Sequence, residues 1–483
     1  MGPTEEDNMP VDTNSANRTD ASQTLNGLET LLRHEGSAPR YTSYPPANFF
    51  TEDPTAIATD LIQASNMADS RALSLYFHIP FCPRRCLFCG CHTEVGRSGA
   101  FINAYMETIS LEFDLLAKQI DRTRPVAQIH FGGGTPNAVP LHYLGELIAK
   151  IRETFRVEPD AEIALECDPG LVLRPQLEQL RTVGFNRVSF GIQDVNLKVL
   201  EAVNRKSSRL PIPELVGTAR DLGFTGINLD LICGLPLQTE SSFRESVEAV
   251  IAAGPDRISL FPYAHVPWIK GHQTALEALP SPGTVDRLRM ALEARDTLQA
   301  AGYEAIGMDH YARPGDELSV AKREGTLRRN FQGYAPPRAG QIHALGASAI
   351  SQLESGYLQN EKDLERYIAR VRNGELPLVG GYRMRVEDKA ARDVINALLC
   401  QGTADVPALI AGYGLSEEWE ADYRLGSLER LAPYLADDLV TEHNGVVRVT
   451  DAGFPLSRRI AAAFDPLTVS TAASATPRYS KTF

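Results

Sequence analysis

The sequence has little of what marks several large protein classes. Its seven cysteines are too few for a disulfide scaffold in a chain of 483 residues. No uninterrupted apolar stretch approaches the roughly 18 residues that a membrane span needs. The first residues, MGPTEEDNMPVDTN, form neither a basic nor an apolar leader segment. We therefore expect a cytoplasmic protein without a membrane span.

Positive charge is also scarce. The chain has 48 Lys and Arg against 61 Asp and Glu, a formal net charge of −13. Such a balance disfavours non-specific binding to nucleic acid or to an anionic membrane, so an anionic ligand would need a local basic pocket. Hydrophobic residues at 43%, with 37 glycines and 31 prolines, are ordinary globular values that exclude collagen, a coiled coil and wholesale disorder.

Short β-branched or apolar runs alternate with longer amphipathic stretches from residue 73 onward, the pattern of βα units. Predicted strands cover 73–79, 126–131, 162–167, 187–192, 226–232 and 257–262. Predicted helices cover 101–117, 141–155, 171–183, 210–222 and 241–253. Six units favour a partial, open (β/α)6 barrel of the α/β class, whose strands end at one common rim.

Other regions read differently. We predict a disordered or loosely docked tail at 1–37, a segment packing over the barrel cleft at 38–72, and the barrel with its substrate-covering elements at 73–383. A further strand is expected at 303–309, and loops with short helices at 313–346. Residues 384–467 indicate a small helical domain of winged-helix type, with a hairpin at 439–449 around Asn444-Gly445. Residues 468–483 are predicted to be a flexible tail.

Four cysteines fall within ten positions, directly after the first predicted strand. Cys82, Cys86 and Cys89 have the spacing that lets three thiolates hold three irons of a four-iron cube and leave the fourth iron open. The alternative is zinc, which would recruit Cys91 or His92 as a fourth ligand. Reduced structural cysteines are a third reading. The remaining three cysteines have apolar neighbours and are expected to be buried.

These features resemble a known superfamily. The cysteine motif, followed by the segment Gly132-Gly133-Gly134-Thr135-Pro136 at the end of the second strand, is similar to radical S-adenosylmethionine (SAM) enzymes. Further motifs narrow the resemblance; they are YFHIPFC at 76–82, CGC at 89–91, ECDP at 166–169, FGIQD at 190–194, VNR at 203–205, PYAH at 262–265, RYTSYP at 40–45, GMDH at 307–310 and RNFQGY at 329–334. Together they resemble the family of oxygen-independent coproporphyrinogen III oxidases over roughly residues 38 to 465.

The resemblance implies an activity. Such an enzyme transfers one electron to a [4Fe-4S] cluster and cleaves SAM to a 5′-deoxyadenosyl radical. The radical takes a hydrogen from the β-carbon of a propionate, which then loses an electron and carbon dioxide. Two propionates of coproporphyrinogen III become vinyl groups, giving protoporphyrinogen IX in anaerobic haem biosynthesis. The alternatives are a haem-binding or haem-trafficking relative and a related methyl-transferring or cyclopropanating radical enzyme.

The resemblance also implies site residues. Cys82, Cys86 and Cys89 would bind the cluster, and Cys91 would serve a catalytic proton or electron step rather than only packing. SAM, expected as two molecules, would be contacted by eleven positions: Tyr76, Phe88, Gly133, Gly134, Thr135, Glu166, Gln193, Arg205, Asp230, Ala264 and Ile350. An electron donor of unknown identity is required, and a monomer is expected.

The substrate bears four carboxylates, so basic residues near the barrel mouth are candidates for binding it. These are Arg40, Arg313, Lys322, Arg323, Arg328 and Arg329, with the run Arg328-Arg329-Asn330 preferred. Two places depart from the family pattern. His92 replaces an expected Asn, and the segment 340–343 (GQIH), expected to line the substrate region, is less acidic than anticipated.

Overall fold

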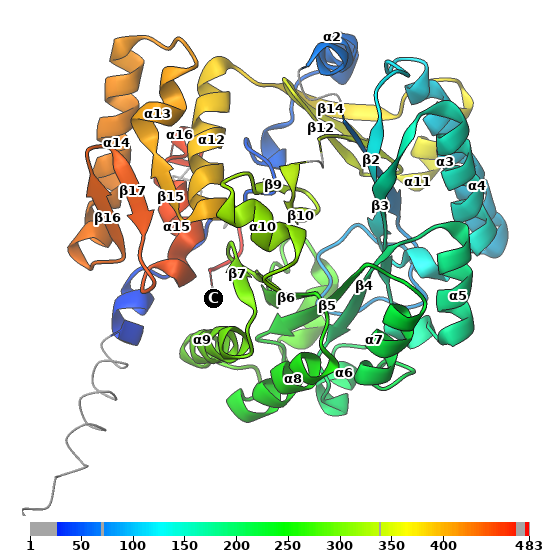
Figure 1. Cartoon of the computed structure of the whole chain (residues 1–483), viewed down its shortest axis with the longest axis horizontal. Helices are drawn as coiled ribbons and strands as arrows, with labels where there is room; N and C mark the ends of the chain where they lie inside the picture. Colours follow the sequence, from blue (N-terminus) through cyan, green and yellow to red (C-terminus); the bar gives the residue numbers. More distant parts are fainter. Residues whose placement is uncertain (1–26, 69–71, 338–339, 470–478, 483) are drawn as a thin grey trace, which may run out of the picture.

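Six parallel strands form the centre of the protein (Figure 1). The computed structural model describes residues 27–68, 72–337, 340–469 and 479–482. The strands lie side by side in chain order, and all six predicted strands are present. Their bounds are β1 (Leu73–Ile79), β2 (Val126–Gly133), β3 (Val157–Cys167), β4 (Arg187–Gln193), β5 (Gly226–Cys233) and β6 (Arg257–Pro262).

Helices connect these strands and cover the outer face of the sheet (Figure 1). They are α3 (Gly99–Ala117), α4 (Leu141–Thr154), α5 (Arg174–Val183), α6 (Leu197–Ala202), α7 (Ile212–Asp221), α8 (Glu240–Ala253) and α9 (Thr284–Ala300). Side chains that accept hydrogen bonds from the first amides of a helix explain where α3 and α8 begin. Ser98 accepts a hydrogen bond from the amide of Phe101 at the start of α3, and Thr239 accepts one from Ser242 at the start of α8. The sequence did not predict the short helix α6.

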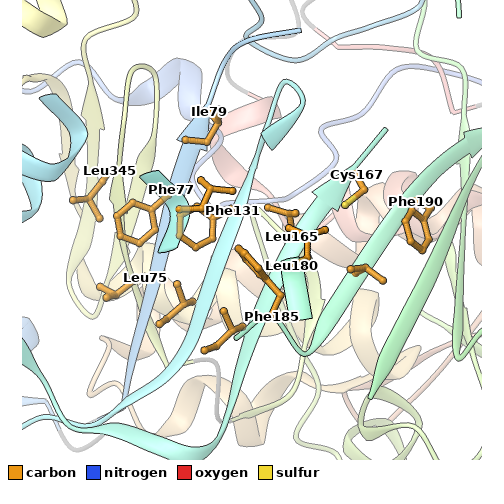
Figure 2. Close-up of a cluster of buried hydrophobic side chains, with 14 of the residues drawn as sticks. Leu75, Phe77, Ile79, Phe131, Leu165, Cys167, Leu180, Phe185, Phe190 and Leu345 are labelled. Atoms are coloured by element: carbon orange, nitrogen blue, oxygen red, sulfur yellow. The ribbon is translucent and has the colours of Figure 1, made fainter. Parts of the chain in front are cut away.

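Strand alternation divides the sheet into an apolar and a polar face. Leu75, Phe77 and Ile79 of β1 are wholly buried in the main core, and Figure 2 shows them in one cluster with side chains of β2, β3 and β4. Tyr76 and His78, one position out of phase, point to the opposite face because successive side chains in a strand alternate. The apolar face therefore packs on the helices, and the polar face is left to line the barrel interior.

The sheet continues past both ends of the parallel core. Beyond β6 lie β8 (His310–Ala312) and β7 (Glu304–Ile306), both antiparallel to their neighbours. Beyond β1 lies β11 (Gln341–Leu345), which is parallel to it, followed by antiparallel strands. These are β12 (Ile350–Leu353), β13 (Gly356–Asn360) and β14 (Leu378–Arg383). The twelve-stranded sheet runs from β14 to β7 without closing, which confirms the open, partial barrel.

The segments after α9 differ most from expectation. The strand predicted at 303–309 is split into β7 and β8, because Gly307 has φ 57° and turns the chain between them. The region 313–346 contains α10 (Glu317–Arg323), the hairpin β9 (Arg328–Asn330) and β10 (Gly333–Ala335), and the unexpected strand β11. Residues 341–343 of the segment 340–343 belong to β11, and the expectation that this segment lines the substrate region stays a prediction. Within it, His343 is buried and its Nε2 lies 3.3 Å from Ser65 Oγ of α2 (Pro54–Met67).

The C-terminal elements form a second core beside the barrel (Figure 1). A three-stranded sheet with the expected Asn-Gly turn packs on helices, and Asn444 and Gly445 both have positive φ. The winged-helix type of this region stays a prediction. The elements are α11 (Leu364–Arg372), which still belongs to the barrel side, then α12 (Val386–Gln401), β15 (Thr403–Asp405), α13 (Val406–Ala411), α14 (Glu417–Ala436), β16 (Val440–His443), β17 (Val446–Val449), α15 (Ser457–Ala462) and α16 (Pro466–Val469).

The predicted tails fall largely outside the described residues, which begin at 27 and omit 470–478 and 483. Leu28 and Leu31, in a helix at 27–33, are buried in the C-terminal core. The domain boundaries stay predictions. Within the described ranges, no helix combines the length and the apolar character needed to cross a bilayer.

The buried His343 predicts an acid-sensitive fold. Burial, followed by nearby Arg124, lowers the pKa of His343 to about 3. In the unfolded chain His343 has a pKa near 6.5, so below that pH it binds a proton that it does not bind in the folded protein. The free energy of unfolding therefore falls as the pH drops from about 6.5 toward 3. Between pH 7.5 and pH 5, the free energy of unfolding should therefore fall by about 2 kcal/mol less in His343→Asn than in wild type. Urea unfolding at the two pH values measures this difference.

A matched control is His142→Asn, because His142 is exposed on α4. That variant should retain the wild-type pH dependence. An unchanged pH dependence in His343→Asn would contradict the burial argument.

Candidate active site

The polar face of the parallel strands surrounds a cavity of about 400 Å³ at the carboxyl end of the barrel. Parallel strands end at one edge, so residues distant in sequence meet there. Lining residues include all four cysteines of the first loop, two glycines that follow β2, and polar side chains from β2 to β6. The last group comprises Gln128, His130, Glu162, Glu166, Arg187, Ser189, Gln193, Asn228, Asp230, Arg257 and Ser259.

Three thiols of the loop after β1 face this cavity, and each has a hydrogen-bond donor. Thr135 Oγ1 lies 3.2 Å from Cys82 Sγ, and Arg205 Nη1 lies 3.5 Å from Cys86 Sγ. The amide of Cys91 donates to Cys89 Sγ at 3.4 Å. Hydrogen bonds from Cys91 lower the pKa of Cys89 to about 6, whereas burial raises the pKa of Cys82 to about 11. The three thiols are free and their donors suit thiolates, the form that binds metal.

The loop is held by contacts to its backbone. From the segment that includes the 3-10 helix η4 (Gly271–Leu276), Lys270 Nζ donates to the Cys91 carbonyl at 2.9 Å and Gln273 Nε2 donates to the Phe88 carbonyl at 2.9 Å. His272 Nε2 lies 2.9 Å from the Cys89 carbonyl. These residues hold the backbone of the cysteine loop and make no contact with its sulfur atoms in these hydrogen bonds. This segment could not be predicted from the sequence, because its contacts are with backbone carbonyl groups.

His78 holds the far end of the same loop. Its Nε2 lies 3.0 Å from the carbonyl of His92, and its Nδ1 lies 3.1 Å from the hydroxyl of Tyr76. Burial lowers the pKa of His78 to about 4, so the ring is neutral at physiological pH. Nε2–H therefore donates to His92, and Nδ1 accepts from Tyr76. Strand alternation could have found His78, because it shares the inner face with Tyr76.

The glycine segment after β2 leaves no space for side chains. A Cβ on Gly134 would lie 2.5 Å from the Pro80 carbonyl oxygen, and one on Gly133, where φ is 116°, would lie 2.7 Å from the His78 ring. The backbone can approach a ligand closely here because both residues are glycine. Glu166 braces the segment by accepting a hydrogen bond from the Gly133 amide at 3.0 Å. His130 Nε2 lies 3.3 Å from the other oxygen of Glu166, a contact that sequence reasoning missed.

The opposite wall combines a guanidinium with two carboxylates. Arg205 hydrogen-bonds the Gly191 carbonyl and lies 3.6 Å from Asp168. Asp168 also accepts a hydrogen bond from the Gly170 amide and thereby caps the 3-10 helix at Pro169–Leu171. Asp230 accepts from Asn228 at 2.7 Å, and burial raises its pKa. Gln193 ends β4 with φ 68°, a conformation disfavoured for residues other than glycine that recurs at functional sites.

Comparison with known proteins agrees with this geometry. Residues 76–250 match the model of the radical SAM superfamily. The oxygen-independent coproporphyrinogen III oxidase of Salmonella typhimurium is 40% identical over 91% of this chain and 94% of its own length. The corresponding protein of Escherichia coli K12 is 39% identical over 91% and 94%. A solved structure of coproporphyrinogen III oxidase from Escherichia coli, described as a radical SAM enzyme, superposes with a TM-score of 0.82 at 38% identity and covers 89% of this chain and 97% of that one.

The chain belongs to the oxygen-independent coproporphyrinogen III oxidase family. Membership confirms the resemblance, the radical SAM fold and the expectation of a [4Fe-4S] cluster and SAM as cofactors. The donor set fits the cluster: three free thiols face a cavity large enough to admit more than one ion. Among the described residues, no group of three or more His, Cys, Asp or Glu side chains is placed to hold a single metal ion.

The cavity gathers most of the predicted SAM-contacting residues of this family. Phe88, Gly133, Gly134, Thr135, Glu166, Gln193, Arg205 and Asp230 line it together with Cys91. Three others do not line it. Tyr76 hydrogen-bonds His78 and stacks on His130, which does line the cavity. Gln273 connects Ala264 to Phe88 by donating to both carbonyls. Ile350 begins β12 and packs near Phe50 and Tyr357. The individual roles of all these residues stay predictions.

The predicted basic residues divide into two groups. Arg313 donates to the carbonyls of Gly254 and Pro255, which directly precede β6. Lys322 donates to the Ala305 carbonyl, and Arg323 pairs with Glu304. Arg328 is exposed. These four are therefore placed away from the cavity. Arg40 and Arg329 are drawn inward, and the preferred pair Arg328-Arg329 is split because alternate residues of β9 face opposite ways.

Replacing the cysteines one at a time tests the cluster assignment. Cys82→Ala, Cys86→Ala and Cys89→Ala should each lose most of the bound iron, because each removes one of three ligands. Iron, sulfide and visible absorbance after anaerobic reconstitution provide the measurement.

Cys91→Ala is the matched control and should keep iron near the wild-type level. Loss of iron from Cys91→Ala equal to that of the other three would contradict a three-cysteine site.

Proposed function

We propose that this protein is an oxygen-independent coproporphyrinogen III oxidase. It converts two propionate side chains of coproporphyrinogen III to vinyl groups in haem biosynthesis and yields protoporphyrinogen IX. One observation carries this conclusion: the cysteine loop, the glycine segment and the carboxylates of β3 and β5 line a single cavity in a chain that aligns with these oxidases over nine-tenths of its length.

The cofactors define the chemistry that the cavity must support. When bound, the cluster and SAM would supply the one-electron radical chemistry that removes a hydrogen from a propionate. Cys82, Cys86 and Cys89 would hold the cluster. Arg205, beside Cys86, would balance part of the negative charge of the thiolates. The reaction also requires an external electron donor of unknown identity.

The residues around the glycine segment suit the amino acid portion of SAM. The Glu166 side chain is 45% exposed, and its pKa lies below the ordinary value because hydrogen bonds from His130 and Gly133 outweigh the effect of burial. It is therefore a carboxylate at neutral pH and can bind a cationic amine. The closely approaching backbone at Gly133 and Gly134 offers amides to the ligand. Gln193 and Asp230 supply groups that can hydrogen-bond the adenosyl portion. Division of these residues between two SAM molecules stays a prediction.

Cys91 is placed to act in the later part of the reaction. It is exposed on the loop, lines the cavity and lies next to Cys89 without being needed as a ligand. Its carbonyl is fixed by Lys270, so the thiol has a defined position at the cavity wall. We infer that Cys91 provides the proton or electron step that the family resemblance implied. A cytoplasmic, monomeric enzyme likewise stays a prediction.

An anaerobic assay tests the function. Reconstituted protein, SAM, a reductant and coproporphyrinogen III should yield 5′-deoxyadenosine together with the divinyl tetrapyrrole, quantified by liquid chromatography with mass detection. The variant Glu166→Gln should lower the kcat/KM for SAM at least about tenfold, because a neutral amide cannot pair with the ligand amine.

A product that carries a new methyl group would instead indicate a methyltransferase. Stable haem binding without turnover would indicate a carrier. Either result would contradict the proposed activity.

A further inference from the structure

Three arginines from separate parts of the chain lie together beside the mouth of the cavity; Arg329 and Arg458 are buried and Arg40 is partly buried. Arg40 lies in the N-terminal segment, Arg329 on β9 and Arg458 on α15. Arg40 Nη2 donates to the carbonyl of Pro262, which ends β6 at the cavity rim. The three groups influence one another: burial, followed by Arg40 and then Arg329, lowers the pKa of Arg458 to about 9.

Their positive charge is not balanced by the protein. Among the described residues, Asp309 is the one carboxylate within ion-pairing distance of any of the three, and it already contacts His310 at 2.8 Å. Arg329 Nη1 is 3.9 Å from Asp309, too far for a hydrogen bond, and has no hydrogen-bond partner although its side chain is only 3% exposed. Asp465, the next carboxylate, accepts the hydroxyls of Tyr41 and Tyr44.

The remaining partners of these arginines are neutral. Arg40 donates to Pro262 at 3.0 Å, Arg458 donates to the Lys481 carbonyl at 2.6 Å, and Arg329 Nε donates to the Arg40 carbonyl at 3.1 Å. A carbonyl oxygen satisfies a hydrogen bond but brings no net charge. Burying cations without counter-ions is costly, so the cluster calls for an anionic ligand.

The arginines also border a space that such a ligand could enter. A cavity of about 60 Å³ is lined by Arg40, Arg458 and Asp309, and its other walls include the apolar side chains of Pro262 and Phe454. This volume suits a carboxylate on a short methylene chain rather than a whole ring system. Phe261 and His310 line the main cavity, and their chain neighbours Pro262 and Asp309 line the small one, so the two spaces lie close together.

Building on the proposed function, we propose that Arg40 and Arg458 bind a propionate carboxylate of the tetrapyrrole in this small cavity, with the open donor of Arg329 adding positive charge behind them. Guanidinium groups match carboxylates bidentately and stay charged. Asp309 holds the arginines in place, and their excess charge leaves room for a second anion. Two of the four propionates are not converted in the reaction. Arginines that bind one of these two would hold the tetrapyrrole through both decarboxylations.

Binding and kinetics together test this proposal. Arg40→Gln and Arg458→Gln should raise the KM for coproporphyrinogen III at least about tenfold and change the KM for SAM less than about twofold. Arg458→Lys, which keeps the charge, should recover part of the loss. The control is Arg313→Gln, because Arg313 likewise donates to backbone carbonyls but lies behind β6; it should match wild type.

A readout independent of turnover uses the redox-stable coproporphyrin III and its tetramethyl ester, with binding followed by fluorescence. Wild type should bind the free acid at least about tenfold more tightly than the ester, and Arg458→Gln should largely lose this preference. Unchanged binding and KM in folded, iron-replete Arg40→Gln and Arg458→Gln would overturn the proposal.

A separate small carboxylate could satisfy the same cluster. In that case added acetate or succinate would alter the thermal stability of wild type but not of Arg458→Gln, while the KM for the tetrapyrrole stayed the same in both. This result would also overturn the assignment to substrate. Absence of divinyl product from wild type itself would refute the proposed function instead, and the binding comparison would still decide whether the cluster recognises tetrapyrrole carboxylates.

Discussion

The active-site arrangement depends on the parallel register of β1 to β6. Because all six strands run the same way, their carboxyl ends form one rim, and the alternation of side chains sends one residue of each pair into the helix-covered core and the other into the barrel. Phe77 and His78 show this division at adjacent positions: the first packs in the core, and the second holds the cysteine loop. A shift of one residue in β1 would exchange them and remove both functions.

Charged side chains in and beside the barrel are of two kinds, those paired with an opposite charge and those largely unpaired. At the amino-terminal ends of β4 and β6, charges that line the cavity are paired: Arg257 Nε donates to Asp316 at 2.8 Å, and Arg187 lies 3.5 Å from Glu162. Burial opposes ionisation of Glu162, yet Arg187 and Arg257 lower its pKa to about 2. This network closes the barrel floor. The three arginines beside the mouth share a single carboxylate, Asp309, and that contrast supports assigning them to ligand binding.

The sequence was sufficient for the parts of the protein with local signals. Hydrophobic runs predicted all six parallel strands, and the spacing of Cys82, Cys86 and Cys89 predicted a metal-binding loop that faces the cavity. Contacts over long sequence separations were not predictable. β11 has polar residues such as His343 buried on its faces, so it lacks the pattern of a central strand, and only its pairing with β1 explains it. His272 and Lys270 act on backbone carbonyls of the cysteine loop, and Arg458 joins Arg40 only when the C-terminal elements pack on the barrel.

The central claim is that three thiols hold a four-iron cluster and leave one iron free for SAM. Mössbauer spectroscopy of protein reconstituted anaerobically with 57Fe, recorded before and after SAM is added, tests it most directly. The account predicts that SAM changes the signal of one iron site out of about four and leaves the others as they were. A spectrum unaffected by saturating SAM, or a preparation that takes up zinc in place of iron under the same conditions, would contradict it.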